Sequence, residues 1–147
     1  MDYSRLLDGL VEHEQLMAKL YREMAAKFPT KSELLQGLSR EEETHASMLV
    51  NIKDSFFPAG AVSESDIDIT MSQLESHAKT IQELIATLAS DTFEEREIIN
   101  TLFDLELSSA ELQINRIVVQ NKDDPRLKVF VEILDAEEAH NRVLEDW

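Results

Sequence analysis

Apolar side chains recur every three or four residues along most of this chain, which is the period of an amphipathic helix. The first such stretch covers about residues 3–28 and the second about 31–53. Thr30 and Glu33 have the spacing of a capping box at the start of the second stretch. Because only a short break at Pro29 separates the two stretches, we expect them to form an antiparallel helical hairpin.

The second half of the chain shows the same period after a long connection. Residues 54–69 mix Pro, Gly, Ser and Asp without a helical pattern, which predicts a connecting segment. Further helices are expected over about 71–89, 93–120 and 125–146. Their predicted starts are marked by Ser72 with Glu75, Thr92 with Glu95, and Asp124 followed by Pro125. The pattern therefore predicts an all-α fold, with two antiparallel hairpins joined by a crossover that contains an additional helix.

Length and composition narrow this picture to one soluble domain. A chain of 147 residues is long enough for a single core, so we treat residues 1–147 as one domain. The net charge of -16 disfavours nucleic acid and anionic membranes as partners and favours cation binding. The chain has no Cys, which excludes thiolate metal sites and iron-sulfur clusters within it. There is neither an apolar signal core nor a membrane-spanning stretch, so we expect a cytoplasmic protein.

One short pattern occurs twice and suggests specific chemistry. Glu42 and His45 in "EEETH" have the same spacing as Glu137 and His140 in "AEEAH". In a chain this rich in Glu the spacing alone is weak, so the direction of the side chains decides. Both pairs share a helix face with Leu and Ile residues, whereas the neighbouring acids share faces with polar residues. We therefore expect both pairs to face the core, and the rest of the run from Glu41 to Glu43 to face solvent.

Two further acids lie on apolar faces of the other two predicted bundle helices. Glu14 shares its face with Leu7, Leu10 and Met17, and Glu106 is preferred to Glu111 because its face carries Leu102, Phe103 and Ile117. No Lys or Arg lies on these faces to balance the charge. Buried carboxylates need protons, charged partners or a metal, and four of them can offset two divalent ions. The sequence therefore predicts a site for two metal ions made of Glu14, Glu42, His45, Glu106, Glu137 and His140.

Four segments, "VEHEQLMAKLY", "SREEETHASML", "LFDLELSSAEL" and "LDAEEAHNRVL", resemble the ferritin-like superfamily, especially its rubrerythrin and bacterioferritin branch. The resemblance spans nearly the whole chain and implies a four-helix bundle that binds two iron ions, for which manganese or zinc could substitute. It implies that the six residues are the iron ligands, with Glu42 and Glu137 as bridges. It also places Tyr21 where similar proteins have a tyrosine near the metals, although packing in the core is the preferred role for this residue.

The chain departs from that family in three ways. Without Cys it lacks the rubredoxin domain that delivers electrons in many rubrerythrins, so we expect a separate electron donor protein. Phe103 occupies the position of an extra Glu in rubrerythrin, which argues against that protein's switchable ligand. The chain ends at Trp147, shortly after His140, without the fifth helix of many ferritins, so a mineral-storing cage is not expected.

The expected function is that of a non-haem di-iron oxidoreductase that reduces hydrogen peroxide or dioxygen as Fe(II) is oxidised, in a response to oxidative stress. One alternative is a ferroxidase that stores or delivers iron, and another is a structural or sensing bundle that binds metal without turnover or binds none. We expect a homodimer. His13 and His77 have no Glu three residues before them and are expected to pack in the core or at an interface.

Overall fold

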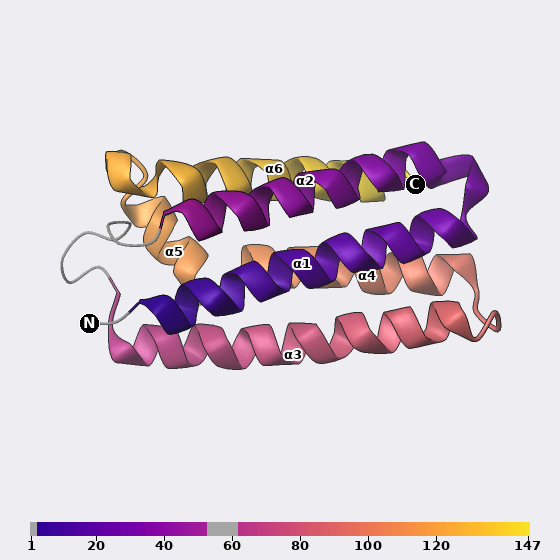
Figure 1. Cartoon of the computed structure of the whole chain (residues 1–147), viewed down its shortest axis with the longest axis horizontal. Helices are drawn as coiled ribbons and strands as arrows, with labels where there is room; N and C mark the ends of the chain where they lie inside the picture. The colour runs from indigo at the N-terminus through magenta and orange to yellow at the C-terminus, as the bar shows by residue number, and fades with distance from the viewer. Residues whose placement is uncertain (1–2, 53–61) are drawn as a thin grey trace.

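A computed structural model describes residues 3–52 and 62–147, and every regular element in this part of the chain is helical. The expected all-α class is confirmed in this coarse sense, with six α-helices and two short 3-10 turns (Figure 1). The elements are α1 Ser4–Lys27, η1 Pro29–Lys31, α2 Ser32–Asn51, α3 Glu64–Ala89, α4 Glu95–Ala110, α5 Gln113–Gln120, η2 Pro125–Leu127 and α6 Lys128–Glu145.

The long helices lie side by side in one bundle. α1 and α2 form the expected antiparallel hairpin, and α6 runs antiparallel to α4 after the short helix α5 (Figure 1). α3 returns the chain to the far end of the bundle and packs along α1 in the same direction. α2 also contacts α6, so both predicted Glu-x-x-His helices are neighbours. The additional helix expected in the crossover is present as α3.

The crossover helix begins earlier than predicted. α3 starts at Glu64 rather than near residue 71, because Ser63 and Asp66 form a reciprocal capping box in which Ser63 Oγ accepts from the Asp66 amide at 3.1 Å. Residues 64–69 are thus helical, and the proposed cap by Ser72 and Glu75 is wrong because both lie inside the helix. Of the remaining predicted connection, residues 62 and 63 are described and are not helical, and residues 54–61 lie outside the described residues.

The predicted helix over 93–120 is also wrong as a single element, because it is interrupted at Glu111 and Leu112. Leu112 adopts an extended backbone with φ -53° and ψ 141° and buries its side chain. Asn115 Nδ2 donates to the carbonyl of Ser109 at 2.7 Å, and the Gln113 amide donates to Gln73 Oε1 at 3.1 Å. These bonds satisfy polar groups that the interruption leaves without helical partners.

Two more predicted caps are not formed. α2 begins at Ser32 without a side-chain cap, because Thr30 belongs to the preceding turn η1. α4 begins without one as well, since Thr92 Oγ1 contacts Ser90 Oγ at 3.1 Å instead. Asp124 does cap the turn after it by accepting from the Arg126 amide at 3.0 Å, but Pro125 opens η2 rather than α6 itself.

The apolar core is divided into two clusters, one toward each end of the bundle. The first, which we call the α5-end cluster, contains Leu6, Leu10, Leu49, Ile114 and Ile133, among others. The second, the Trp147-end cluster, contains Met17, Leu20, Leu38, Leu102 and Leu144, among others. On α1, α2, α4 and α6, the predicted site residues lie along the chain between members of the two clusters.

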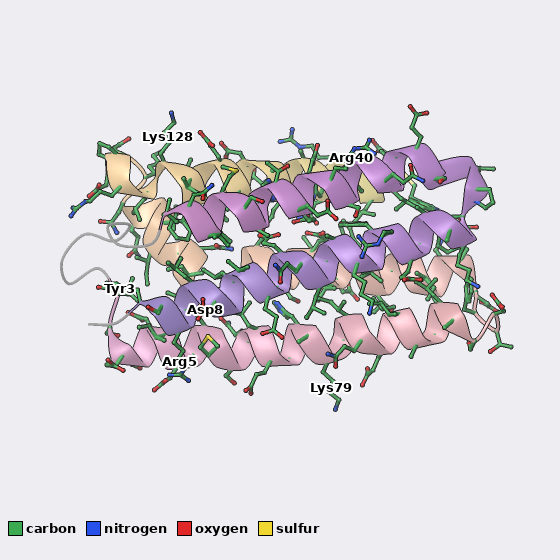
Figure 2. The ribbon with its side chains drawn as sticks, in the orientation of Figure 1. Tyr3, Arg5, Asp8, Arg40, Lys79 and Lys128 are labelled. Atoms are coloured by element: carbon green, nitrogen blue, oxygen red, sulfur yellow. The ribbon has the colours of Figure 1, made fainter. Side chains whose placement is uncertain are left out.

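Two surface and packing features complete the fold. Charged side chains such as Lys79 and Lys128 point away from the bundle (Figure 2). Gly9 lets α3 approach α1 closely, because a Cβ there would lie 2.8 Å from Met71 Sδ. Within residues 3–52 and 62–147, the helices are too short or too polar for any of them to cross a bilayer.

Candidate metal centre

All six residues predicted to bind metal are buried at the level between the two apolar clusters. They come from α1, α2, α4 and α6, and they are Glu14, Glu42, His45, Glu106, Glu137 and His140. The acids that were predicted to face solvent, among them Glu12, Glu43 and Glu138, are exposed. The predicted direction of these side chains is thereby confirmed, whereas their role as ligands stays a prediction.

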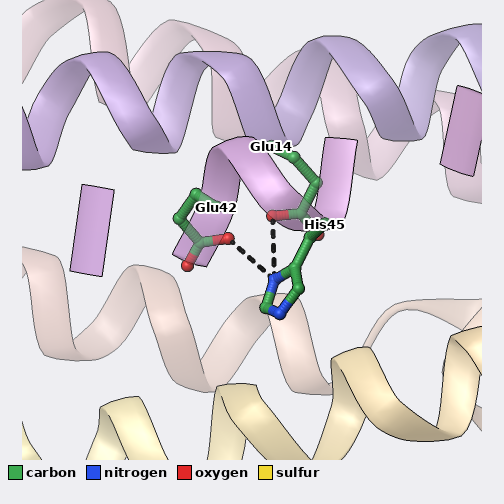
Figure 3. Close-up of side chains that lie close together, drawn as sticks. All are labelled: Glu14, Glu42 and His45. Carbon is green, nitrogen blue, oxygen red and sulfur yellow. Dashed lines mark hydrogen bonds and ion pairs between the residues drawn. The ribbon is translucent and has the colours of Figure 1, made fainter. Parts of the chain in front are cut away.

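Glu14, Glu42 and His45 form a first group in which one ligand atom of each residue lies within 4.8 Å of the others. His45 Nδ1 is 3.4 Å from Glu42 Oε2 and 4.0 Å from Glu14 Oε2, as Figure 3 shows. Glu42 and His45 stand one turn apart on α2, so the helix itself sets their spacing. Glu14 is brought to them by the antiparallel packing of α1 on α2.

Glu42, Glu106 and His140 form a second group by the same criterion of 4.8 Å. His140 Nδ1 lies 2.9 Å from Glu42 Oε1, and the rings of His45 and His140 are stacked with centroids 6.3 Å apart. Glu42 is therefore common to both groups, with one oxygen facing each histidine. A carboxylate in this position can bridge two cations.

Glu137 belongs to neither group, although it is buried on α6 one turn before His140. Its Oε2 atom is buried and has no hydrogen-bond partner among the described residues. An unpartnered carboxylate oxygen in a protein interior is costly, and a bound cation would remove that cost. The four residues Glu14, Glu42, Glu106 and Glu137 also have no ion pair with a Lys or Arg of the described chain.

Burial and mutual repulsion strongly shift the pKa values of the buried acids. Burial, together with the charge of Glu42, raises the pKa of Glu106 to about 7 and that of Glu14 well above its usual range. Burial and the charges of Glu106 and Glu42 raise the pKa of Glu137 in the same way. Without a metal, protons therefore have to take the place of cations at these three carboxyl groups.

Glu42 and His140 form the charged pair of this cluster. Burial alone would raise the pKa of Glu42, but its contacts with Glu14, His140 and His45 lower it well below its usual range. Burial would lower the pKa of His140, but Glu42, Glu106 and Glu41 outweigh that effect and raise it to about 9. His140 is thus protonated at neutral pH without a metal, and a cation would replace the proton on Nδ1 that faces Glu42.

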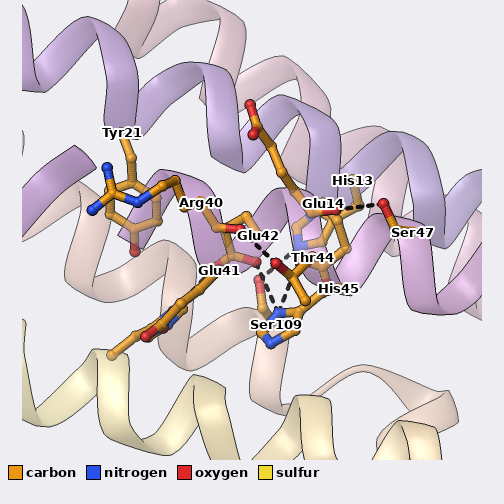
Figure 4. A network of polar contacts seen from close by, with 12 residues as sticks. His13, Glu14, Tyr21, Arg40, Glu41, Glu42, Thr44, His45, Ser47 and Ser109 are labelled. Atoms are coloured by element: carbon orange, nitrogen blue, oxygen red, sulfur yellow. Dashed lines mark hydrogen bonds and ion pairs between the residues drawn. The ribbon is translucent and has the colours of Figure 1, made fainter. Parts of the chain in front are cut away.

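Two residues outside the six contact the side chains of predicted ligands. Tyr21 donates from its hydroxyl to Glu106 Oε1, and its buried phenol stays neutral because burial and Glu106 raise its pKa. Glu41 Oε2 lies 2.5 Å from His140 Nε2. Figure 4 shows Tyr21, Glu41, Glu42 and His45 among the residues of this polar network. Tyr21 was expected mainly to pack in the core, and it does more than that.

The contact of Glu41 with His140 was missed by the sequence analysis. The side chain of Glu41 is 56 % exposed, as expected of a solvated face, but its carboxylate reaches inward to a histidine that is 1 % exposed. Glu41 and His140 line the same groove between α2 and α6, with a volume of about 540 Å³. The available signal was position, because Glu41 lies three residues after buried Leu38 and four before buried His45, at the border of the inward face.

His13 and His77 are buried, as expected, and they contact each other across α1 and α3 with ring centroids 5.6 Å apart. His13 Nε2 lies 3.4 Å from Ser109 Oγ, while the Nδ1 atoms of both rings have no hydrogen-bond partner among the described residues. Burial, and next the neighbouring His77, lower the pKa of His13 to about 4, so it is neutral at pH 7. Both rings pack beside the site rather than within its two groups.

Comparison of this chain with protein-family models, with curated proteins and with solved structures finds no match. The functional conclusion therefore depends on the site itself. With all four carboxyl groups ionised and both imidazoles neutral, these donors would carry a charge of -4 that no Lys or Arg of the described residues balances, and they could hold divalent metal ions. The donor set and the unpartnered oxygen of Glu137 both fit such ions.

Proposed function

We propose that this chain is a di-iron carboxylate protein of the ferritin-like type, related in function to the rubrerythrins, which reduces hydrogen peroxide or dioxygen. The observation that carries the proposal is the position of Glu42, whose two carboxylate oxygens face His140 at 2.9 Å and His45 at 3.4 Å. A carboxylate shared by two groups of buried acid and imidazole donors is what a centre with two metal ions requires.

In this proposal all six residues would bind the metal ions. Glu14, Glu42, His45, Glu106, Glu137 and His140 would hold the two ions, with Glu42 common to both groups and Nδ1 the nitrogen that each histidine directs toward Glu42. Glu41 would accept a hydrogen bond from the N–H at His140 Nε2, which would leave Nδ1 available to a cation. Tyr21 holds Glu106 through Oε1, so its other oxygen is free to bind.

When bound, two Fe(II) ions would supply the two electrons that, with two protons, convert hydrogen peroxide into two water molecules. The protein must keep other water away from the reaction and hold its ligands still. The two apolar clusters do the first on both sides of the site, since Leu10, Met17, Leu38 and Leu102 are all buried. The groove beside His140 and Glu41 offers a small oxidant a route from solvent.

Renewed turnover requires an external source of electrons. This chain contains no Cys and hence no iron-sulfur centre of its own. We therefore propose that a separate electron donor protein returns the oxidised ions to Fe(II). A homodimer is proposed as the working assembly, because a small assembly leaves the outer faces of the bundle open to such a donor.

The proposal is tested by anaerobic reconstitution with Fe(II), followed by a measurement of iron per chain and then by addition of peroxide. We expect about two irons per wild-type chain and oxidation of two Fe(II) by each peroxide. Glu42→Ala and His140→Ala should lose iron, because each removes a donor at the centre of the site. Glu43→Ala is the matched control, since Glu43 is the exposed neighbour of Glu42 and pairs with Arg22 at 3.2 Å.

The alternatives give different results in the same experiment. Iron that is oxidised and then accumulates far beyond two ions per chain, in an assembly the size of a closed shell, would indicate storage. Two bound irons that peroxide does not oxidise would indicate a sensing or structural bundle. Wild-type protein that binds no iron tightly would overturn the proposed metal centre.

A further inference from the structure

Five of the six proposed ligands form two halves around the common residue Glu42, and Glu137 belongs to neither half. The first half consists of Glu14 and His45, and the second half of Glu106 and His140. The halves correspond along the sequence, because each contains a lone Glu and the His of one Glu-x-x-His pair. If the two halves were equivalent, the same types of residue would contact the ligands of each half, but these contacts differ.

The second half is supported on both of its ligands. Tyr21 on α1 donates a hydrogen bond to Glu106, and Glu41 on α2 contacts Nε2 of His140 at 2.5 Å. Each contact restricts the orientation of a proposed ligand side chain. The side chain of His140 is also only 1 % exposed.

The first half lacks the counterpart of the Glu41 contact. Glu41 directly precedes Glu42 on α2, and the residue that directly precedes Glu137 on α6 is Ala136. The methyl group of Ala136 cannot accept a hydrogen bond from an imidazole N–H. Within residues 3–52 and 62–147, the polar contacts of His45 are those of Nδ1 with Glu42 and Glu14.

The first half also lacks the counterpart of Tyr21. Tyr21 stands seven residues after Glu14, and the residue seven after Glu106 is Gln113. The interruption between α4 and α5 places Gln113 against α3, where its Nε2 donates to Asp66 Oδ1 at 3.1 Å and its amide donates to Gln73. Gln113 is therefore engaged away from Glu14.

We propose that the two halves bind metal unequally, so that the Glu106–His140 half takes the first ion tightly and the Glu14–His45 half takes a second, exchangeable ion. This inference rests on the proposed metal centre. Glu41 and Tyr21 are positioning residues in it, because they act on the ions only through His140 and Glu106. Outer contacts of this kind commonly change metal affinity by about 10- to 100-fold.

The test is a titration with Co(II) alone at constant pH, followed by visible absorbance. Wild-type protein should bind two ions in separate steps whose dissociation constants differ by about 10-fold or more. His45→Ala should keep the tight step and lose the weaker one, whereas His140→Ala should lose the tight step. Far-ultraviolet circular dichroism of each variant shows whether its helices remain.

The positioning residues are tested by removal and by addition. Glu41→Ala should weaken the first step by about 10- to 100-fold and leave the second almost unchanged, so that the two steps merge at low affinity. Glu41→Gln keeps an oxygen acceptor and should restore part of the loss. Ala136→Glu supplies the missing acceptor beside His45, so both steps should then have the same high affinity. If the Ala136→Glu protein does not fold, Ala136→Asp provides a shorter acceptor. Glu43→Ala is again the control and should change neither step.

The outcomes separate this inference from the function on which it rests. Two ions bound with equal affinity, or a tight step that survives in His140→Ala, would overturn the inequality and leave the metal centre standing. The same holds if Glu41→Ala weakens both steps equally. Wild-type protein that binds no Co(II) would overturn the metal centre itself.

Discussion

At the two ends of the bundle, Leu, Ile and Met side chains fill the space between the helices, whereas midway along the same helices that space is filled by four carboxylates and two imidazoles. Burial of apolar surface stabilises the folded state by about 25 cal/mol per Å². Burial of acids without balancing cations opposes folding. The difference indicates that the ends hold the bundle together, whereas the middle carries buried groups that could hold a metal ion.

The largest expected effect comes from the ends. Leu102→Ala removes a fully buried side chain of the Trp147-end cluster and should lower the free energy of unfolding by about 2–5 kcal/mol. Chemical denaturation measures the loss. If ends and middle are separate in function, the folded variant still binds metal with wild-type stoichiometry, and loss of binding at low denaturant would contradict that separation.

The second effect is the pH dependence of the metal-free protein. The pKa of Glu106 is raised to about 7 and that of His140 to about 9, so the folded state holds more protons than the unfolded state between pH 6.5 and 9. His140 therefore stabilises the fold at the acid end of this range and loses that contribution as the pH rises, while Glu106 opposes folding increasingly as it ionises. Denaturation in the presence of a chelator should show stability falling by about 1–4 kcal/mol across the range.

A variant sharpens this prediction. Glu106→Gln cannot ionise and should flatten part of the pH dependence, while Glu111→Gln, which changes an exposed acid, should not. Stability that rises from pH 6.5 to 9 without metal would contradict the assignment of protons to these groups.

The third effect concerns Glu137, whose Oε2 has no described partner. Glu137→Gln removes a buried acid and should stabilise the metal-free protein at pH 8 by about 1–3 kcal/mol, while it weakens metal binding. Thermal unfolding with and without added Co(II) measures both quantities. Glu138→Gln, at the exposed neighbouring position, should leave both unchanged, and destabilisation by Glu137→Gln would show that the acid contributes to the fold.

The smallest effect is expected beside the site. His77→Leu replaces a buried ring whose Nδ1 has no described hydrogen-bond partner, so the free energy of unfolding should change by less than about 1 kcal/mol. Chemical denaturation again provides the measurement. A loss of more than about 2 kcal/mol would mean that His77 has a polar partner, such as a water molecule in the nearby 90 Å³ cavity between α1 and α3.

The sequence predicted the buried acids because the argument needed only the helical period. Glu42 is buried and Glu43 is exposed, as their neighbours on each face required. The predicted bounds of the crossover helix failed for a different reason. Ser63 and Asp66 form its cap within a stretch whose Ser, Asp and Gly content resembles a loop, and the long-range pattern gave no sign of that local bond.

The contacts that distinguish the two halves of the site could not be predicted in the same way. The interruption at Leu112 carries no Gly or Pro and is stabilised by Gln73 of another helix. Glu41 lies in a run of acids and is exposed on α2, yet its carboxylate contacts His140 on α6. Both features depend on how separate helices meet, which a period along one helix does not contain.

The division of the core has a further consequence for how the chain unfolds. The two apolar clusters are separated by a layer of buried acids whose pKa values are raised by burial and by one another. Because this layer contributes little apolar packing, we expect one end of the metal-free bundle to open in hydrogen exchange while the other stays closed. A pair of cations would tie four helices together at this layer. Metal binding would then convert two loosely coupled ends into one cooperative unit, and amides far from the site would gain protection together.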